Sequence, residues 1–592
     1  MSSLDIARSI AFSGLSATQV QISIASANIS NADTKGYTEK TANQSSNVTA
    51  GVGTGVTITG ISSAVDKLLL KSLVGADSDL GAANTNNSYL TELQQLYGST
   101  SSGGSSTTGT SLANTLAAFE SALSSLASTP SSASLQSNAV SALSAVTTQL
   151  QQTSTGIQKL RANADQDIAS SVSDINSDLQ QISDLNKQIK QEAAAGQPTA
   201  DLEDQRNSAL QDLASQMNVS YFTTSSGDLQ IYTGSGQALV DSTAHPLSFT
   251  PTSNVTASTT YVAGSPTSGF SGITVNGVDI TSQISSGKVS ALVNLRDQTL
   301  PAAQSQLDEL AQQLTASVNA VSNQGTSVPP PASLTGTATV SNATPLSATG
   351  TVRIAVADKS GNLVSYQDLN LASYTTVGAL ATAINGISGV SASVDANGHL
   401  TISASGSGNG IAINEMTSSV GSSAEGFSDY FGLNDLITGT SASNIAVRSD
   451  ILNGTAALPT STLDASSTLA VGSSVLSAGS ATVVNALSSA LTGSTNFAMA
   501  GGLGATTGSF TDYAAAIVAN VAGKAAQASS TYTAKQTAQS TYASSMSSQS
   551  GVNIDQESAN LSALQNKYAA ASQIITSINA MFSALMTAMT TA

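Results

Sequence analysis

The 592-residue chain contains no cysteine and no tryptophan, and only two histidines. The absence of cysteine excludes a disulfide framework, a thiolate metal site and a cysteine nucleophile. His245 and His399 each stand alone in a β-type segment, and we interpret both as surface or turn residues. No zinc HExxH motif, GxSxG nucleophile elbow or GxxxxGK[ST] phosphate loop occurs. We therefore expect no catalytic residues, no cofactor and no metal site.

Charged residues are also scarce, at 9% of the chain against roughly 25% in ordinary soluble domains. They comprise 36 Asp and Glu but only 18 Lys and Arg, which gives a net charge of −18. This charge repels phosphate backbones, so we expect no nucleic-acid partner. The first residues do not resemble a secretory signal, and no apolar run approaches 18 residues, so we expect no membrane insertion.

A regular apolar stripe occupies the C-terminal end of the chain. Its members follow 3-4 spacing, which predicts a helix with a seam on one face. Asp555 and Glu557 precede the stripe, where they would complement the positive end of the helix dipole. The stripe comprises Leu561, Leu564, Tyr568, Ala571, Ile575, Ile578, Phe582, Leu585 and Met589.

A similar stripe, with smaller and more polar members, begins the chain. It is followed by a run of cap and turn formers from Asn28 to Tyr37, in which Gly36 would supply a positive φ. Apolar seams usually belong to an internal core, but these two have no partner nearby in sequence. We expect them to pair with each other or with neighbouring copies, and to be disordered in the free monomer. The N-terminal stripe comprises Leu4, Arg8, Ala11, Leu15, Thr18, Ile22, Ala25 and Ile29.

The pattern predicts a mostly α fold with inserted β domains: paired terminal coiled-coil helices, a long helical bundle and β-rich outer domains. Helical periodicity covers about 143–189, 201–217, 301–321 and 510–548, whereas short alternating runs at 218–290 and 337–450 indicate strands around a helix near 377–386. A Gly/Ser/Thr run at 101–110 is typical of a loop. We divide the chain into an N-terminal assembly helix (1–36), a bundle (37–217, 291–325 and 506–554), a β-rich segment (218–290), a variable outer domain (326–505) and a C-terminal assembly helix (555–592).

Two further groups invite a chemical interpretation that we do not favour. Gly406, Gly408 and Gly410 lie between strand-like runs and indicate a turn more than a phosphate loop. The acidic residues in 201–206 begin a predicted helix, where carboxylates serve as caps and dipole partners.

Four motifs together resemble the flagellar hook-associated protein 1 family. Ser26–Asn31 followed by Thr34–Tyr37 resembles a signature shared by rod, hook and hook-associated proteins, and Ser550–Glu557 resembles that family's C-terminal signature. Two internal stretches narrow the match: 202–240, which opens with Leu-Glu-Asp-Gln-Arg, and 295–319, which opens with Leu-Arg-Asp. Residues that carry the terminal signatures are Asn28, Ser30, Asn31, Gly36, Tyr37, Gly551, Asn553, Asp555 and Glu557. The family usually has Pro where Lys35 stands and Arg where Glu39 stands.

The resemblance implies a structural subunit of the bacterial flagellum that is not an enzyme. Such proteins leave the cell through the flagellar type III export channel and form the extracellular hook–filament junction. The implied partners are neighbouring copies, the hook protein, a second junction protein and a cytoplasmic export chaperone at the C-terminal helix. The expected assembly interface comprises Leu4, Ala11, Leu15, Ile22, Ile29, Leu561, Leu564, Tyr568, Ile575, Ile578, Phe582 and Leu585.

Other functions remain open at this point. A hook subunit shares both terminal signatures but not the internal motifs, and a flagellin would lack the N-terminal signature. A Ser/Thr-rich surface adhesin would need a signal peptide and an anchor. A hydrolase on an axial scaffold is disfavoured because histidine is so scarce.

Overall fold

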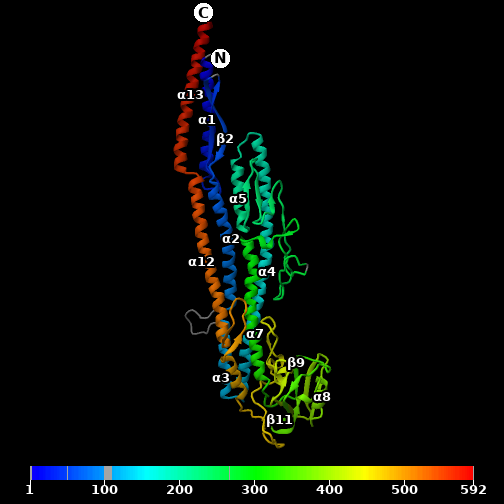
Figure 1. The fold of residues 1–592 in the computed structure, drawn as a ribbon. Helices are drawn as coiled ribbons and strands as arrows, with labels where there is room; N and C mark the ends of the chain where they lie inside the picture. Colours follow the sequence, from blue (N-terminus) through cyan, green and yellow to red (C-terminus); the bar gives the residue numbers. More distant parts are fainter. Residues whose placement is uncertain (1–2, 50, 99–109, 266, 591–592) are drawn as a thin grey trace.

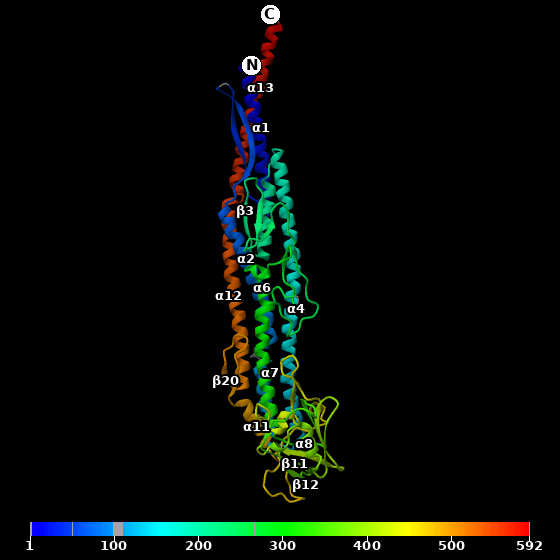
Figure 2. The same cartoon turned by 45° about the vertical axis from the view of Figure 1, so that its right-hand side comes forward.

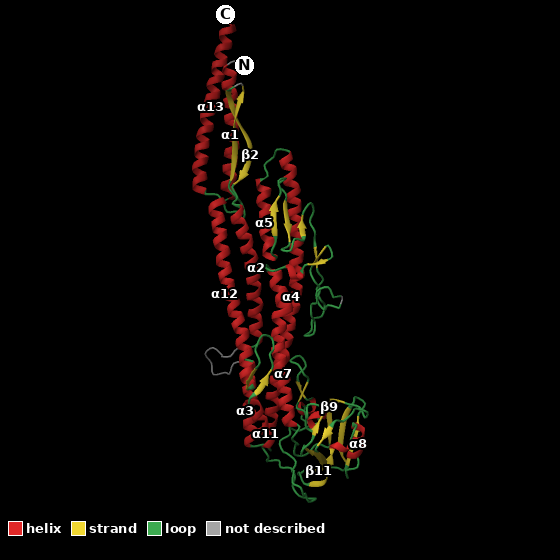
Figure 3. Ribbon diagram, in the orientation of Figure 1, coloured by secondary structure: helices red, strands yellow, loops and turns green. Residues whose placement is uncertain are grey.

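The computed structural model describes residues 3–49, 51–98, 110–265 and 267–590. The molecule is long and narrow, with both termini at one end, a helical bundle in the middle and a β-rich domain at the other end (Figure 1, Figure 2). Most of the expected loop at 101–110 lies outside the described residues. The prediction of a mostly helical chain with inserted β structure is confirmed (Figure 3).

Long helices form the stalk of the molecule. The longest helices run nearly parallel to the long axis of the molecule. Two helices of the stalk, α2 and α3, were not predicted from the sequence. Side-chain caps mark several helix starts: Asp66 accepts hydrogen bonds from the amides of Leu68 and Leu69, and Ser509 forms a capping box with Asp512. The larger helices are α1 (Ser3–Asn31), α2 (Lys67–Leu96), α3 (Leu112–Ser128), α4 (Ala133–Ala194), α5 (Ala200–Gln216), α7 (Leu300–Ser322), α11 (Thr482–Thr492), α12 (Phe510–Ser550) and α13 (Ile554–Thr590).

The central helix α4 follows directly from its sequence pattern. It covers the range 143–189 predicted from helical periodicity, and the large apolar residues that carry this periodicity, from Leu143 to Ile189, are buried in the bundle. The helix ends at Ala194, two residues before Gly196, which has φ +73° as a helix-terminating glycine often does. α5 then returns beside α4, at the position predicted for the second helix.

The third predicted helix starts earlier than its pattern indicates. α6 (Lys288–Asn294) continues through a π-helical segment (Leu295–Thr299) into α7. Pro301 lies at the first turn of α7, a position that a proline tolerates. The shorter helices elsewhere are α8 (Val377–Ile384), α9 (Phe427–Phe431) and α10 (Ser449–Leu452), with 3₁₀ turns at Thr281–Gln283 and Leu371–Ser373.

All strand pairings in the described part of the chain are antiparallel. The long hairpin of β1 (Lys40–Thr49) and β2 (Val52–Ser63) lies against α1. Beside the bundle, β3 (Ser220–Thr223), β4 (Leu229–Tyr232) and β5 (Ala238–Val240) form one sheet, and β6 (Leu247–Ser248), β7 (Thr274–Val275) and β8 (Val278–Asp279) form another.

The outer domain contains two three-stranded sheets. One has the order β12-β11-β15 and the other has the order β13-β14-β9. The strands are β9 (Ser333–Thr339), β10 (Ala348–Thr349), β11 (Thr351–Asp358), β12 (Leu363–Asn370), β13 (Val390–Val394), β14 (His399–Ala404), β15 (Asn409–Asn414) and β16 (Ser419–Val420). Three further strand pairings outside these sheets are β10 with β16, β17 (Ile437–Thr438) with β18 (Ala446–Val447), and β19 (Thr495–Phe497) with β20 (Thr506–Gly508).

The described cores place part of the expected outer domain in the bundle. Residues 334–433 bury their own apolar cluster. In contrast, Leu436, Ile445, Val484 and Leu491 join the core built on α4 and α7. The chain therefore returns to the bundle at about residue 434, whereas Leu463, Val475 and Leu476 pack again against the outer-domain strands β11, β12 and β15. The division at 326–505 stays a prediction.

Candidate functional site at the base of the terminal helices

The two terminal signatures meet at the base of α1 and α13. The side-chain amide of Asn28 donates to Glu557 Oε1 at 2.8 Å and to the Lys40 carbonyl at 2.9 Å. Its oxygen accepts hydrogen bonds from the Tyr37 hydroxyl at 2.9 Å and from the Lys40 amide at 3.0 Å. Asn28 is fully buried and Glu557 is 6% exposed. One asparagine therefore joins α1, β1 and α13.

A buried ion pair joins the same region to α5. Lys40 Nζ contacts Asp204 Oδ2, and both residues are nearly buried, at 5% and 6% exposed. Asp204 also accepts hydrogen bonds from the amide and hydroxyl of Thr38. The ammonium lies 4.2 Å from the Tyr37 ring centroid, which adds a cation–π contact. We call the group Asn28, Tyr37, Lys40, Asp204 and Glu557 the junction cluster.

The junction cluster corrects one sequence interpretation. Asp201 and Glu203 lie in the first turn of α5, as expected for dipole partners. Asp204 does not act in that way, because its carboxylate points to Thr38 and Lys40 in another part of the chain. The cation of this pair is Lys40, whereas residue 39, the usual family arginine, is a glutamate here. No local pattern predicts an ion pair between residues 164 positions apart.

Burial and neighbouring carboxylates raise the pKa values of Tyr37 and Glu39. Burial, followed by the charges of Asp201, Asp204 and Glu557, raises the pKa of Tyr37 to about 12. The phenol therefore remains protonated and donates to Asn28 at neutral pH. Burial and the nearby Glu557 carboxylate also raise the pKa of Glu39.

The remaining signature residues shape the backbone around the junction cluster. Gly36 has φ +81°, as predicted, and a Cβ there would collide with the Ser208 side chain. Gly551 ends α12, with its amide on the Ser547 carbonyl at 2.9 Å. The Asn553 side chain accepts a hydrogen bond from the Gln556 amide at 3.1 Å.

Three other signature residues make no contact with the side chains of the cluster that the structure records. The side chains of Ser30 and Asn31 bond only to carbonyls of their own helix or to Thr34. Asp555 is exposed in the first turn of α13, where it complements the helix dipole.

Above the junction cluster, α1 and α13 lie side by side (Figure 1, Figure 2). The guanidinium of Arg8 lies 5.7 Å from the ring centroid of Phe582. Of the expected C-terminal interface residues, only Leu564 and Ile578 are buried. Leu4, Ala11, Leu15, Ile22, Ile29, Leu561, Ile575 and Phe582 are half-buried, whereas Tyr568 and Leu585 are exposed. The role of these residues in assembly remains a prediction.

Apolar side chains that face solvent are concentrated on the terminal helices. Ile10 and Phe12 of α1 are 42% and 51% exposed, and Leu585 is 49% exposed. One stretch within Phe510–Thr590 is long and apolar enough to cross a membrane by length and composition, and 6% of it is buried. The sequence interpretation overlooked this stretch because polar residues interrupt its apolar run. Other exposed apolar residues of α13 are Ile554, Tyr568, Ile574, Met581, Met586 and Met589.

Buried arginines explain why the internal motifs contain charged residues. Arg296 Nη1 lies 2.7 Å from Asp165 Oδ1 on α4, and Arg296 stacks against the Phe270 ring at 4.5 Å. The Arg206 guanidinium donates to Asn186 Oδ1 at 2.9 Å and to the Gly227 carbonyl at 2.8 Å. These contacts attach the loop and sheet segments between α5 and α6 to the bundle.

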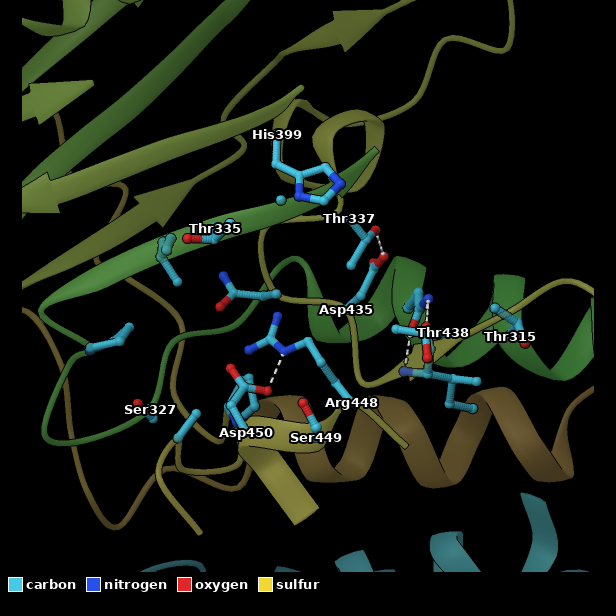
Figure 4. Close-up of a pocket in the computed structure, with 18 of the residues that line it drawn as sticks. Thr315, Ser327, Thr335, Thr337, His399, Asp435, Thr438, Arg448, Ser449 and Asp450 are labelled. Carbon is cyan, nitrogen blue, oxygen red and sulfur yellow. Dashed lines mark hydrogen bonds and ion pairs between the residues drawn. The ribbon is translucent and has the colours of Figure 1, made fainter. Parts of the chain in front are cut away.

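A polar cavity beside His399 lies between the outer domain and the bundle, with a volume of about 790 Å³ (Figure 4). His399 lines it, and the imidazole Nδ1 lies 3.8 Å from Asp395 Oδ2. The Arg448 guanidinium points into the cavity and pairs with Asp450 at 2.7 Å. In the cavity lining, the Thr337 hydroxyl donates a hydrogen bond to Asp435 Oδ2, and Asp435 also accepts one from the side-chain amide of Asn323 (Figure 4).

The second histidine is also explained by its local contacts. His245 Nε2 lies 3.1 Å from Asp241 Oδ2. Hydrogen bonding by the Thr243 amide and then by His245 lowers the pKa of Asp241 to about 2. Within the described residues, no group of three or more His, Cys, Asp or Glu side chains is placed to hold a metal ion.

Comparison with known proteins identifies what this architecture is similar to. Residues 101–332 match the model of the flagellar hook-associated protein FlgK helical domain, a range that includes α3 to α7. The resemblance to the hook-associated protein 1 family is confirmed. Residues 9–38 match the flagella basal body rod protein model, and residues 351–406 match the flagellin hook IN motif.

Relatives named flagellar hook-associated protein 1 match part of the chain. The protein of Salmonella typhimurium is 26% identical over 324 residues, which is 53% of this chain and 56% of the relative. The Escherichia coli K12 protein is 26% identical over 312 residues. The chain thus spans about half the length of these relatives. The superposition on a solved structure, the flagellar hook junction protein FlgK from Burkholderia pseudomallei, covers 80% of this chain and 99% of the solved chain. The sequence identity is 16% and the TM-score is 0.47.

The family consists of structural flagellar proteins and not of enzymes. The match to the rod model includes Asn28 and Tyr37 of the junction cluster, and the helical-domain match includes Asp204. Two separately matched segments therefore meet at one buried cluster.

Proposed function

We propose that this protein is a structural subunit of the hook–filament junction of the bacterial flagellum. It polymerises at the distal end of the hook through its terminal helices, which form a coiled coil with each other and with neighbouring copies. The observation that carries the proposal is the exposed apolar surface of α13, which pairing with α1 leaves largely uncovered. Neighbouring copies would bury this surface, and each large apolar side chain would contribute roughly 1.5–3 kcal/mol.

The partners follow from position in the flagellum. They are further copies of this chain, the hook protein below and a second junction protein above. We also propose export through the flagellar type III channel, with a cytoplasmic chaperone on α13 before export. An exposed apolar helix in a monomer is a surface that such a chaperone would protect. The site of action is then extracellular.

The junction cluster is proposed to set the direction of the terminal helices relative to the bundle. Asn28 contacts α13 and the Lys40–Asp204 pair contacts α5, so both ends of the chain are attached at one point. A fixed direction is needed because copies in a closed assembly must present the same surface at the same angle.

Deletion of residues 555–592 tests the proposed function. The chromosomal gene is replaced by the truncated one, and cells are examined by electron microscopy while the medium is assayed for filament protein. We expect complete hooks without filaments and filament protein lost to the medium, with the full-length gene restoring filaments. Normal filaments would contradict the proposal. Absent hooks would indicate a hook subunit instead.

A further inference from the structure

The turn between β7 and β8 places an Asn-Gly pair beside a histidine. Asn276 and Gly277 form the two-residue connection of this hairpin, with φ of +49° and +79°, and both are exposed. Positive φ at both positions is typical of a type I′ turn, which favours Asn followed by Gly. The side-chain amide nitrogen of Asn276 lies 3.3 Å from His245 Nδ1. Asn-Gly is also the pair at which an asparagine side chain most readily cyclises, because glycine has no side chain to hinder its own amide nitrogen.

His245 is oriented by an acid on the other side of its ring. Its Nε2 is shielded from solvent and lies 3.1 Å from Asp241 Oδ2. Hydrogen bonding by the Thr243 amide and then by His245 lowers the pKa of Asp241 to about 2, so this carboxylate is charged at neutral pH. A charged carboxylate behind an imidazole orients the ring and stabilises its protonated form. A proton donor is therefore held at the side-chain nitrogen of Asn276.

The main-chain nitrogen of Gly277 is available as a nucleophile. The sequence contains five Asn-Gly pairs. In three of them the glycine amide donates to a backbone carbonyl: Gly386 to Ala383, Gly398 to Asp395 and Gly454 to Ile451. The pair at 409–410 lies within strand β15. The Gly277 amide has no acceptor among the residues that the structure describes, so its nitrogen is free to attack.

We propose that Asn276 is a site of spontaneous deamidation, assisted by His245, that gives aspartate and isoaspartate. The Gly277 nitrogen attacks Cγ of Asn276 and loses its proton to solvent. His245 passes the Nδ1 proton to the side-chain nitrogen, the Cγ–Nδ2 bond breaks and ammonia leaves, which gives a cyclic imide. Water returns a proton to the imidazole, and a second water opens the imide at either carbonyl. The inference goes beyond the proposed function and does not depend on it.

The turn has to open before the ring can close. β6, β7 and β8 contain two residues each, so few hydrogen bonds hold this hairpin in place. Either product replaces the neutral amide beside His245 by a carboxylate. Isoaspartate also lengthens the main chain of the turn by one carbon, so conversion should loosen the β6–β8 sheet.

Peptide mapping by mass spectrometry tests the inference on the purified full-length protein, incubated at neutral pH. It measures the rate at which each Asn-Gly pair is converted from amide to acid, and chromatographic retention separates isoaspartate from aspartate. We expect Asn276 to convert faster than the other four asparagines. Asn453 is the matched internal control, because it is also exposed and is also followed by glycine. Conversion of Asn276 at the rate of Asn453, or more slowly, would overturn the proposal.

His245→Gln separates a catalytic role of the imidazole from a structural one. Glutamine keeps a hydrogen-bonding group beside Asn276 but has no acidic proton to transfer. General acid catalysis typically contributes about 10²–10⁴-fold, so conversion of Asn276 should slow at least about tenfold while the other four pairs keep their rates. Unchanged or faster conversion of Asn276 in this variant would overturn the role of His245.

Asp241 is a positioning residue in this scheme, since it acts through the imidazole. Asp241→Asn should slow the conversion of Asn276, and Asp241→Glu should restore part of the rate, because glutamate again places a carboxylate behind the ring. The rates at the other four Asn-Gly pairs should stay the same in both variants. An unchanged rate at Asn276 in Asp241→Asn would overturn the role of Asp241.

Discussion

Asn28 Nδ2 lies 2.8 Å from Glu557 Oε1, a hydrogen bond that links the first and last helices across 529 positions of sequence. The contact is buried, and the acceptor is charged, which makes such a bond stronger than a neutral one. This polar contact fixes the register of α1 against α13, which apolar contacts alone would define less strictly.

Asn28→Ala should loosen this attachment. It leaves Glu557 and the Lys40 carbonyl without their partner, at a cost of about 1–3 kcal/mol. Amide hydrogen exchange at residues 36–40 and 550–557 should accelerate by roughly 5- to 150-fold, since about 1.4 kcal/mol corresponds to a factor of ten. Ser30→Ala is the matched control, because Ser30 bonds only to its own helix. Equal exchange in the two variants would contradict the role assigned to Asn28.

Asp204→Asn should destabilise the whole chain more strongly. It leaves the Lys40 ammonium buried with only the more distant Asp201 at 3.5 Å, and breaking a buried pair typically costs about 3–5 kcal/mol. Urea unfolding of the full chain measures the loss. Asp184→Asn removes the exposed pair with Lys187 and should leave the urea midpoint almost unchanged. If both variants unfold at the same urea concentration, the Lys40–Asp204 pair is not a structural attachment.

Stability of the outer domain should fall as pH rises through 6. Burial, followed by the charges of Asp435, Glu425 and Glu415, raises the pKa of Asp429 from 3.8 to about 6. A pKa that is higher in the folded chain favours folding at low pH, and this stabilisation is lost as the carboxyl ionises. We expect a loss on the order of 1 kcal/mol between pH 5 and 7.5 after allowance for solvent screening.

Hydrogen exchange of residues 333–433 in the full chain measures this dependence on pH. Asp429→Asn removes the titrating group and should flatten it. An unchanged slope in that variant would exclude Asp429 as its source.

A substitution in the bundle core should lower the stability of the monomer, whereas one in the exposed stripe of α13 should lower incorporation at the hook. Ile175 on α4 is fully buried, so Ile175→Ala should cost about 2–5 kcal/mol of unfolding free energy in the monomer. Leu585 is 49% exposed, so Leu585→Ala should change monomer stability by less than about 0.5 kcal/mol yet reduce incorporation at the hook. Calorimetry and quantitative blots of isolated hooks measure the two effects. Full incorporation of Leu585→Ala would argue against the seam as an interface.

Periodicity predicted the helices whose apolar residues repeat cleanly. It placed α4, α5 and α12 because their buried stripes or breakers, such as Gly196, are visible locally. α2 was missed because its face is rich in Asn, Ser and Thr, and its burial comes from α12, more than 400 positions away. The strands of the outer domain were recognised in outline, for example at Thr351 and His399.

The junction cluster was visible in sequence only as a family signature. Nothing local indicates that Asn28 contacts Glu557 or that Lys40 contacts Asp204, because both contacts depend on the folded path of the chain. The return of residues 436–458 to the bundle was missed for the same reason.

The central claim is that the apolar stripe of α13 remains uncovered until neighbouring copies bury it. Hydrogen exchange of residues 561–589 measures this most directly, in purified monomer and in isolated hook–junction complexes. We expect rapid exchange in the monomer, where only Leu564 and Ile578 of the stripe are buried, and strong protection in the complexes. Strong protection already present in the solitary monomer, unchanged on assembly, would contradict the account.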